Sequence, residues 1–301
     1  MKFVIWTPGF DINNGGVIAL HLLCHRLALA GHDARLWPWQ RPEPRPKTVR
    51  RFLSSVRRYS LRGDRDFDTG PFPNVLAGYR DLKDAVVVYP EIATGNPLGS
   101  RRVVRWLLHR PGFHTGEVEY GKDDLFFYFM KQFDDPSLNS EPNNELLVTW
   151  TNPVYRDAQR AEREGSCFLV RKGVGRPFVH DEASIPIDGL SHEETNCVFN
   201  RTERLYCYDP YTRYAMYAAV AGCLPIVVPE PGVSKEQWMP SSRDRYGIAY
   251  GDGDVDWAIA TRPDLLRRLR EDEDVEGRLL QRFIAKCHER FGADLPKQPA
   301  S

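Results

Sequence analysis

The amino-acid sequence predicts an α/β protein made of two consecutive halves, each built on a parallel β-sheet. The first observation is an opening series of apolar run, glycine-containing loop, helical segment and second apolar run, which is a β-α-β unit. The second is a further series of short apolar runs and helical segments after residue 166. The third is the length of 301 residues, which suits about two domains. Two α/β domains are therefore expected.

The opening unit begins with residues 2–6, a β-branched and aromatic run that is typical of a strand. Residues 33–39 are predicted to form the second strand. Gly31 is expected to end the intervening helix, since glycine is common just after a helix C-terminus. The helix itself is indicated by apolar residues at helical spacing, namely Val17, Leu20, Leu23, Cys24, Leu27 and Ala28.

Residues 41–65 interrupt this pattern. The segment is Pro-rich at its start and basic throughout, and its only acids are Glu43 and Asp64. We interpret it as an exposed, mobile insert. Such an insert can attract an anionic acceptor or a lipid surface, although a solvated loop is the simpler interpretation and the favoured one.

Further elements follow in both halves. In the first half, residues 101–109 fit either a strand or a short helix, and the other predicted strands are 84–92, 125–130 and 145–150. The polar stretch 151–166 fits a helix or a linker, so we place the domain boundary there, with an N-terminal domain over 1–160 and a C-terminal domain over 161–301.

In the C-terminal half, Ser191 and Glu194 have the spacing of a capping box at the start of a helix. Charged sequence with apolar leucines from Asp254 onward predicts a final helical region. The predicted helices before it are 191–202 and 212–222, and the predicted strands are 167–173, 204–209, 224–230 and 247–251.

Composition disfavours several classes of protein. Lys+Arg and Asp+Glu are both 41, and this balance argues against a nucleic-acid partner. No stretch approaches the roughly 18 apolar residues of a membrane span, and the first apolar run is too short for a signal peptide. A cytoplasmic protein with at most a peripheral membrane contact is expected. The six cysteines form no Cys-x-x-Cys pair, so we expect buried, reduced thiols and no metal site.

Two segments carry residues suited to a phosphate-bearing ligand. Gly15 and Gly16 precede the first helix, where backbone can approach an anion, although a plain strand-to-helix turn is the slightly favoured interpretation. Arg171 and Lys172 stand beside Gly173 at the end of a predicted strand. Two adjacent cations suit a diphosphate, the alternative being a solvated surface. The absence of a G-x-G-x-x-G fingerprint disfavours a nicotinamide dehydrogenase.

A third ligand-binding segment begins where a predicted strand ends at Asp209. Thr212 is placed to cap the next helix. Tyr211, Tyr214 and Tyr217 cluster at the helix start, where a nucleotide base could stack and a diphosphate could meet free N–H groups. A capped helix whose tyrosines pack against a neighbour is the alternative of equal weight.

Four residues are candidates for acid–base chemistry. Glu91 follows a predicted strand, where a carboxylate can act as a base or bind sugar hydroxyls. His109 and His114 lie in one loop, and Asp11 lies in the loop before the first helix. A single Glu or His in a loop is more often structural, and this alternative stays open for each of them.

Taken together, these segments resemble bacterial GT-B glycosyltransferases of polysaccharide and lipopolysaccharide pathways. The first strand, the Gly15–Gly16 loop and the helix ending in Ala-Gly-His are similar to the family's opening unit. The segment YDPYTRYAMYAAVAGCLPIVVPE, residues 208–230, is similar to its donor-binding segment. The likeness covers about Phe168 to Gly251 and the first 37 residues.

The resemblance implies two Rossmann-like domains that face each other across a cleft, with a nucleotide-diphosphate-sugar donor on the C-terminal domain and the acceptor on the N-terminal domain. The implied reaction is a metal-independent and cofactor-free transfer of a sugar to a glycan or lipid-linked acceptor in cell-surface polysaccharide biosynthesis. The implied donor contacts in this sequence are Gly15, Gly16, Arg171, Lys172, Asp209, Tyr211 and Thr212. An inverting enzyme would need Asp11, Glu91 or His109 as a base, whereas a retaining enzyme needs none, and the sequence leaves both open.

Tyr217 stands where many retaining members of the family carry a glutamate that binds the donor ribose. A tyrosine can stack and donate a hydrogen bond, but it cannot supply a carboxylate for two hydroxyls. This departure leaves open a different ribose contact, an unusual donor or a loss of activity. Two alternatives to a transferase follow, namely a non-catalytic binding or partner subunit with a degenerate donor site and a nucleotide-sugar epimerase.

Overall fold

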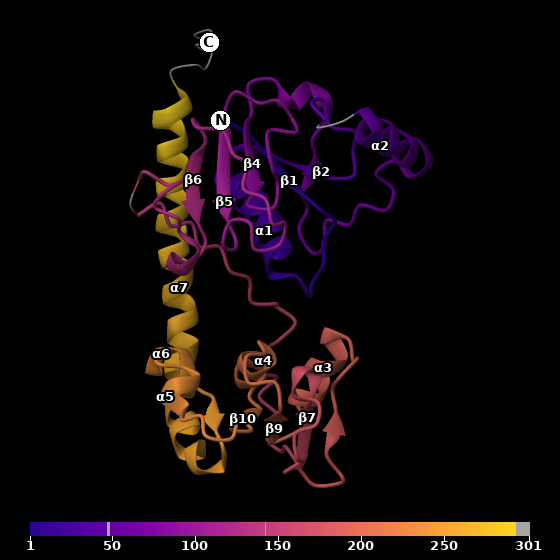
Figure 1. Ribbon diagram of the computed structural model, residues 1–301. Coiled ribbons are helices and arrows are strands. Elements are labelled where there is room, and N and C mark those ends of the chain that lie inside the picture. The colour runs from indigo at the N-terminus through magenta and orange to yellow at the C-terminus, as the bar shows by residue number, and fades with distance from the viewer. Residues whose placement is uncertain (47–48, 142, 293–301) are drawn as a thin grey trace. The chain divides into compact units, whose positions relative to one another are not determined.

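The computed structural model describes residues 1–46, 49–141 and 143–292. Packing divides the chain into two compact units, which Figure 1 shows coloured along the chain. Unit 1 comprises Met1–Trp150 and the chain from Asp274 onward, and unit 2 comprises Thr151–Glu273. Both units are α/β in class and each is built on one parallel sheet, so the predicted fold class is confirmed at this level.

Unit 1 has a six-stranded sheet in the order β3-β2-β1-β4-β5-β6, with all neighbours parallel. This is the Rossmann strand order, which reverses between β1 and β4. Most of its strands are apolar and buried, because both faces of the sheet are covered. The strands are β1 Lys2–Thr7, β2 Asp33–Pro38, β3 Val75–Leu76, β4 Val86–Pro90, β5 Val103–Leu107 and β6 Leu125–Tyr128.

One face of this sheet is covered by α1 (Gly15–Leu29) and by the C-terminal part of α7 (Val255–Phe291). Phe283 of α7 is fully buried, with its ring centroid 5.7 Å from that of Phe3 and 4.9 Å from that of Phe127. Helix α7 begins in unit 2 and ends in unit 1. The last helix of the chain therefore completes the core of the first half.

Connecting segments, including the short 3-10 helix η1 (Tyr79–Leu82), cover the opposite face, and the buried Arg105 of β5 holds one of them in place. Its guanidinium pairs with Asp124 at 2.7 Å, donates to the carbonyls of Ala93 and Gly95, and lies over an aromatic ring of β4. A charge this deeply buried is tolerated because it is paired and hydrogen-bonded. Arg105 thereby fixes the segment that follows β4. A further 3-10 helix, η2, comprises Lys131–Phe133.

Unit 2 has a five-stranded parallel sheet in the order β11-β10-β9-β7-β8. This is a doubly wound arrangement whose strand order reverses between β7 and β9. The strands are β7 Ser166–Leu169, β8 Ile185–Pro186, β9 Arg204–Cys207, β10 Leu224–Val227 and β11 Ala249–Tyr250. The helices are α3 His192–Phe199, α4 Tyr214–Ala221, α5 Lys235–Trp238 and α6 Ser242–Arg245, with 3-10 turns η3 Arg171–Gly173 and η4 Asp252–Asp254.

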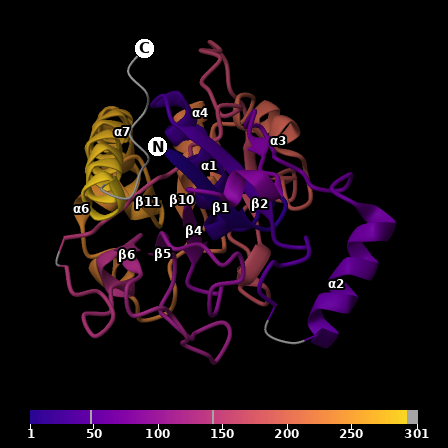
Figure 2. The same cartoon turned by 90° about the horizontal axis from the view of Figure 1, so that it is seen from above.

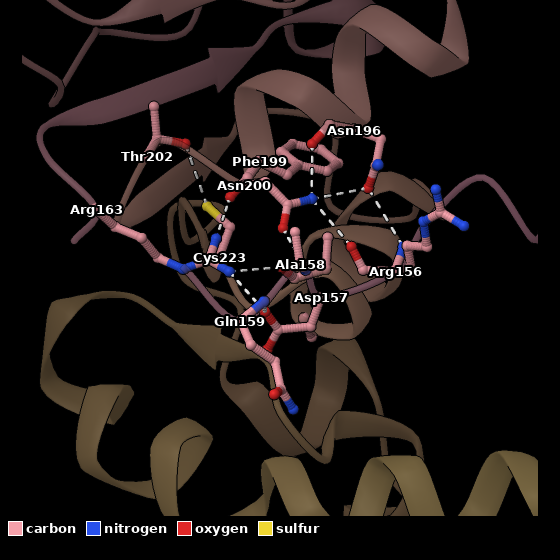
Figure 3. Close-up of polar contacts among 12 residues, drawn as sticks. Arg156, Asp157, Ala158, Gln159, Arg163, Asn196, Phe199, Asn200, Thr202 and Cys223 are labelled. Atoms are coloured by element: carbon pink, nitrogen blue, oxygen red, sulfur yellow. Dashed lines mark hydrogen bonds and ion pairs between the residues drawn. The ribbon is translucent and has the colours of Figure 1, made fainter. Parts of the chain in front are cut away.

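A polar network ties the first residues of unit 2 to the ends of α3 and α4 (Figure 3). The Asn200 side chain donates to the Arg156 carbonyl at 2.9 Å and accepts the Ala158 N–H at 2.7 Å. The Arg163 guanidinium donates to Asp157 at 2.8 Å and to the last carbonyls of α3 and α4. The network lies at the amino-terminal edge of the sheet, so it anchors unit 2 without occupying the carboxyl-terminal edge.

The basic segment 41–65 differs from its predicted form. Instead of a loop, it contains helix α2 (Val49–Arg62), although Lys47 and Thr48 lie outside the described residues. Arginine and leucine are good helix formers, and no Gly or Pro interrupts residues 49–62. The high charge of the segment favours a solvated loop, whereas its helix-forming residues and the helical spacing of Val49, Phe52, Leu53 and Val56 account for the helix.

The other differences from the predicted secondary structure concern short segments whose sequence pattern does not identify the type of element. Residues 145–150, predicted as a strand, form one isolated bridge between Glu145 and Tyr128, and pack into the core without a ladder. Residues 101–109, which fitted a strand or a helix, contain β5. The short strands β3 and β8 were not predicted. No helix of the described residues is long and apolar enough to cross a membrane.

The domain division also differs from the sequence-based boundary near residue 160. The compact units separate after Trp150, and residues 274–292 pack with unit 1. A helical pattern shows that α7 has an apolar face, but it carries no information about which sheet that face covers.

Phe283→Ala is expected to lower the free energy of unfolding by about 3–5 kcal/mol, because it removes a fully buried ring and leaves a cavity. Leu29→Ala is the control, since Leu29 is 71% exposed, and it should change stability by less than about 0.5 kcal/mol. Chemical denaturation measures both. Equal effects of the two substitutions would show that α7 does not complete the core of unit 1.

Candidate functional site

The carboxyl ends of β7 and β9 bring together two of the segments identified from the sequence. Arg171 and Lys172 follow β7, and Asp209, Tyr211 and Thr212 follow β9. The two strands are neighbours, and the strand order reverses between them. Ligands of such sheets bind at the carboxyl edge where the order reverses. We call this pair of loops the unit 2 site.

Gly173 allows the two loops of the unit 2 site to touch. A Cβ atom on Gly173 would lie 2.3 Å from the carbonyl oxygen of Tyr208 and 2.6 Å from its Cβ. No side chain larger than hydrogen fits at this separation. Turn η3 therefore packs directly on the backbone that leaves β9, and this contact sets the position of Arg171 and Lys172.

Arg171 and Lys172 give the unit 2 site a positive charge. Both residues are exposed, and neither forms an ion pair with any carboxylate that the structure describes. Arg171 has a left-handed φ of 41°, and its backbone N–H donates to Asp188 at 3.0 Å. Its guanidinium carbon lies 5.5 Å from the ring centroid of Tyr214. Backbone in this sparsely populated region is concentrated at ligand sites.

Arg176 is a residue of this region that sequence reasoning missed. Its guanidinium donates to the carbonyls of Tyr208, Val228 and Pro229 at 2.6, 2.8 and 2.5 Å. The Tyr208 hydroxyl accepts the Val179 N–H at 2.8 Å, which attaches the loop after η3 to the same residue. Arg176 thus joins the loops after β7, β9 and β10. Carbonyl acceptors leave no pattern in a sequence, so only the structure distinguishes Arg176 from its basic neighbours.

The tyrosines of this segment have three different environments. Tyr217 is buried in the core of unit 2, with its ring stacked on Tyr155 at a centroid distance of 4.2 Å, and burial raises the pKa of its hydroxyl. Tyr214 is half-buried beneath Arg171, whereas Tyr211 is 63% exposed. Tyr211 therefore has the most accessible ring of the three.

Helix α4 begins one residue later than the expected cap. Its N-cap is Arg213, whose side chain forms no capping hydrogen bond, while the Thr212 hydroxyl accepts the Tyr214 N–H at 3.3 Å. The nearly buried Asp209 carboxylate accepts the Tyr211 N–H at 3.4 Å. The first N–H groups of a helix lack partners within it and favour an anion. The start of α4 therefore adds to the positive potential of the unit 2 site.

Unit 1 has a second candidate site where its own strand order reverses, between β1 and β4. Glu91 follows β4 directly, is 5% exposed, and accepts the backbone N–H of Leu108 at 3.0 Å. Burial raises the pKa of Glu91 to about 7, against the opposing effect of backbone N–H groups that include Leu108 and His109. A carboxyl group that titrates near neutral pH suits a general acid or base.

The other predicted residues of unit 1 surround the start of α1. A Cβ on Gly15 would meet nothing within 4 Å, and a Cβ on Gly16 would make ordinary contacts at 3.5 and 3.6 Å, so neither position requires glycine for steric reasons. The Asn14 side chain caps α1, accepting a helix N–H at 3.2 Å. The exposed Asp11 carboxylate accepts the Asn13 N–H at 2.9 Å, which stabilises the loop before the helix.

His109 lies in an aromatic cluster. Its ring stacks on Phe133 at a centroid distance of 4.9 Å and lies 4.2 Å from that of Phe113. Burial and the neighbouring His114 lower its pKa, so the imidazole is neutral at neutral pH. Its packing between rings makes it less suited than Glu91 to proton transfer.

A cavity of about 360 Å³ opens between the end of β1 and the segment that follows Glu91. Trp6, Thr94 and Thr115 contribute to its lining. Trp6 is 5% exposed, and its indole N–H has no acceptor among the described residues. The indole nitrogen is itself inaccessible to solvent, so it is not a contact atom of the cavity. No sequence pattern singles out Trp6, because an aromatic residue inside a strand is expected to be core.

The described residues contain no group of His, Cys, Asp and Glu side chains that could hold a metal ion. All six cysteines are free thiols, of which Cys197 is exposed and the others are buried. Comparison of the sequence with models of known protein families found no match, and comparison with curated proteins also found none. Function is therefore inferred from the fold and the two sites.

Gly173→Ala is expected to destabilise the protein by about 1–3 kcal/mol, because the new Cβ must displace the backbone of Tyr208. Gly253→Ala serves as the control, since a Cβ there would meet nothing within 4 Å. Urea denaturation should separate the two variants. Similar stabilities for both would mean that η3 does not rest on the backbone after β9.

Glu91 should make stability depend on pH in a direction opposite to that of most carboxylates. Its native pKa lies above the unfolded value, so the stability due to its protonated form is present in acid and is lost as pH rises through the native pKa of about 7. Glu91→Gln should gain roughly 3 kcal/mol relative to the native protein at about pH 8 and nothing at about pH 4.

Denaturation at both pH values measures this difference. The exposed Glu289→Gln is the control and should show no pH-dependent gain. A gain for Glu91→Gln that is the same at both pH values would contradict the raised pKa.

Proposed function

We propose that the protein is a GT-B-type glycosyltransferase that moves a sugar from a nucleotide-diphosphate-sugar to a glycan or lipid-linked acceptor. The observation that carries the proposal is the meeting of two cations and a helix start at the reversal point of the unit 2 sheet. Arg171 supplies a fork of donors and Lys172 a point charge, and both suit a diphosphate. The first N–H groups of α4 favour the same anion.

In this proposal the unit 2 site holds the donor. As the bond between the sugar and the diphosphate breaks, negative charge develops on the leaving diphosphate, and Arg171 and Lys172 stabilise it. The accessible ring of Tyr211 stacks on the nucleotide base. Because protein cations and helix N–H groups supply the positive charge, the proposed reaction requires no metal.

Glu91 is the proposed base of an inverting reaction. The acceptor hydroxyl gives its proton to the Glu91 carboxylate while its oxygen attacks the anomeric carbon, and the diphosphate leaves with the bonding electrons. A carboxyl group with a pKa of about 7 is substantially ionised at neutral pH and is basic enough to take that proton. The cavity that opens after Glu91 is the proposed acceptor site. The proposal requires the two units to face each other across a cleft.

A thermal-shift panel of nucleoside diphosphates and nucleotide-sugars tests the donor site. A ligand at about 100 times its dissociation constant should add roughly 2.7 kcal/mol of stability, and Arg171→Ala/Lys172→Ala should remove that gain. The exposed pair Arg160→Ala/Arg201→Ala, near the amino-terminal edge of the same sheet, is the matched control and should retain it. If no nucleotide shifts the native protein, the donor site is refuted.

An assay of sugar transfer, run beside the thermal-shift panel, separates transfer from binding. Glu91→Gln should keep the nucleotide shift and lose sugar transfer, because the amide cannot accept the proton. A non-catalytic partner subunit is the second candidate, and it is favoured by the burial of Tyr217 where the family resemblance places a ribose-binding glutamate. It predicts a nucleotide shift without transfer in the native protein. Conversion of the donor without acceptor would instead indicate an epimerase.

A further inference from the structure

Helix α2 stands clear of the sheet of unit 1 in both views of the molecule (Figures 1 and 2). Its C-terminal end is attached through Tyr59, whose hydroxyl donates to Asp64 at 3.0 Å, and Asp64 is ion-paired with Arg41 at 2.5 Å. Arg41 is itself buried and donates to the carbonyl of Ala77. The helix is therefore fixed at one end while much of its surface faces solvent.

An apolar stripe runs along α2. Val49, Phe52, Leu53 and Val56 recur at helical spacing and so lie on one side of the helix. Val49 is 74% exposed, Leu53 61% and Phe52 38%. Apolar side chains gathered in this way on a surface commonly mark a contact with another molecule or a membrane.

The rest of α2 is strongly basic. Its sequence, VRRFLSSVRRYSLR, contains five arginines and no acidic residue, although the whole chain has a net charge of +0. The exposed Arg50 and Arg57 follow the stripe on the Leu53 side of the helix by the same helical repeat. The positive charge of this segment is therefore local, and it borders the apolar stripe directly.

Of a second copy of the chain, a nucleic acid and an anionic membrane, the membrane uses both features at once. A second copy of the chain would bring two arginine-rich helices together, and like charges repel. A nucleic acid would neutralise the arginines and leave the stripe in water. An anionic membrane takes the apolar side chains into the boundary between headgroups and acyl chains while its phosphates meet the arginines.

We propose that α2 docks unit 1 on an anionic lipid membrane, with Val49, Phe52 and Leu53 inserted below the headgroups and the arginines on lipid phosphates. This inference goes beyond the proposed sugar transfer and does not depend on it. Membrane docking through α2 requires no transmembrane helix.

Vesicle cosedimentation of the full chain tests the proposal. The native protein should sediment with vesicles of equal parts phosphatidylcholine and phosphatidylglycerol and remain in solution with phosphatidylcholine alone. Leu53→Glu and Arg50→Glu/Arg57→Glu should each weaken binding about ten-fold or more. Binding of the native protein should also fall as salt rises.

The matched control variants carry the same types of substitution on other helices. Leu29→Glu changes a leucine on α1 that is 71% exposed, and Arg270→Glu/Arg278→Glu reverses two exposed arginines of α7. Both should bind vesicles like the native protein. All α2 variants should keep the native circular dichroism spectrum and any nucleotide-induced thermal shift, which separates this test from that of the proposed function.

Two results would overturn the proposal. One is vesicle binding that is equal for the native protein and both α2 variants, or that is absent with phosphatidylglycerol. The other is a dimer, seen by sedimentation velocity, that Leu53→Glu dissociates without any vesicle binding of the native protein, because the stripe would then belong to a second copy.

Discussion

The close approach of Gly173 to the Tyr208 carbonyl is the constraint on which the unit 2 site depends. It lets a short turn rest on the end of the neighbouring strand, so that Arg171 and Lys172 arrive at the same edge as the start of α4. Arg176 then commits its own donors to three backbone carbonyls, which holds the surrounding loops together. Arg176 therefore stabilises the loops, whereas Arg171 and Lys172 remain available to bind an anion.

The candidate site of unit 1, where its strand order reverses, differs in electrostatic character from the unit 2 site, because it holds a buried carboxyl group in place of exposed cations. Glu91 is buried and is opposed only by backbone N–H groups, with no cation among the causes that set its pKa. Arg105, the buried cation that fixes the segment after Glu91, is paired with Asp124. With burial as the largest cause, the pKa of Glu91 is raised and its proton is held more tightly. The two units thus present a positive site and a proton-accepting site at equivalent places in their sheets.

Local signals in the sequence predicted much of this structure. The capping box of Ser191 and Glu194 was confirmed at the start of α3, because both of its hydrogen bonds form within four residues of chain. Glu91, Arg171 and Lys172 were identified from their places after apolar runs. The burial of Tyr217 on Tyr155 and the role of Arg176 depend on residues distant in sequence, so no local pattern could reveal them. The prediction of a loop for the segment that contains α2 was wrong, because charge and exposure do not distinguish a solvated helix from a solvated loop.

Helix α7 has a consequence for the order in which the protein forms during synthesis. The sheet of unit 1 is synthesised before α7, so the face that Phe283, Ile284, Cys287 and Phe291 cover stays open until α7 has been made. Unit 2 is fully translated at Glu273, before that cover exists. The second unit can thus reach its native state ahead of the first. Until then the nascent chain carries an open apolar sheet face, the kind of surface that chaperones shield from aggregation.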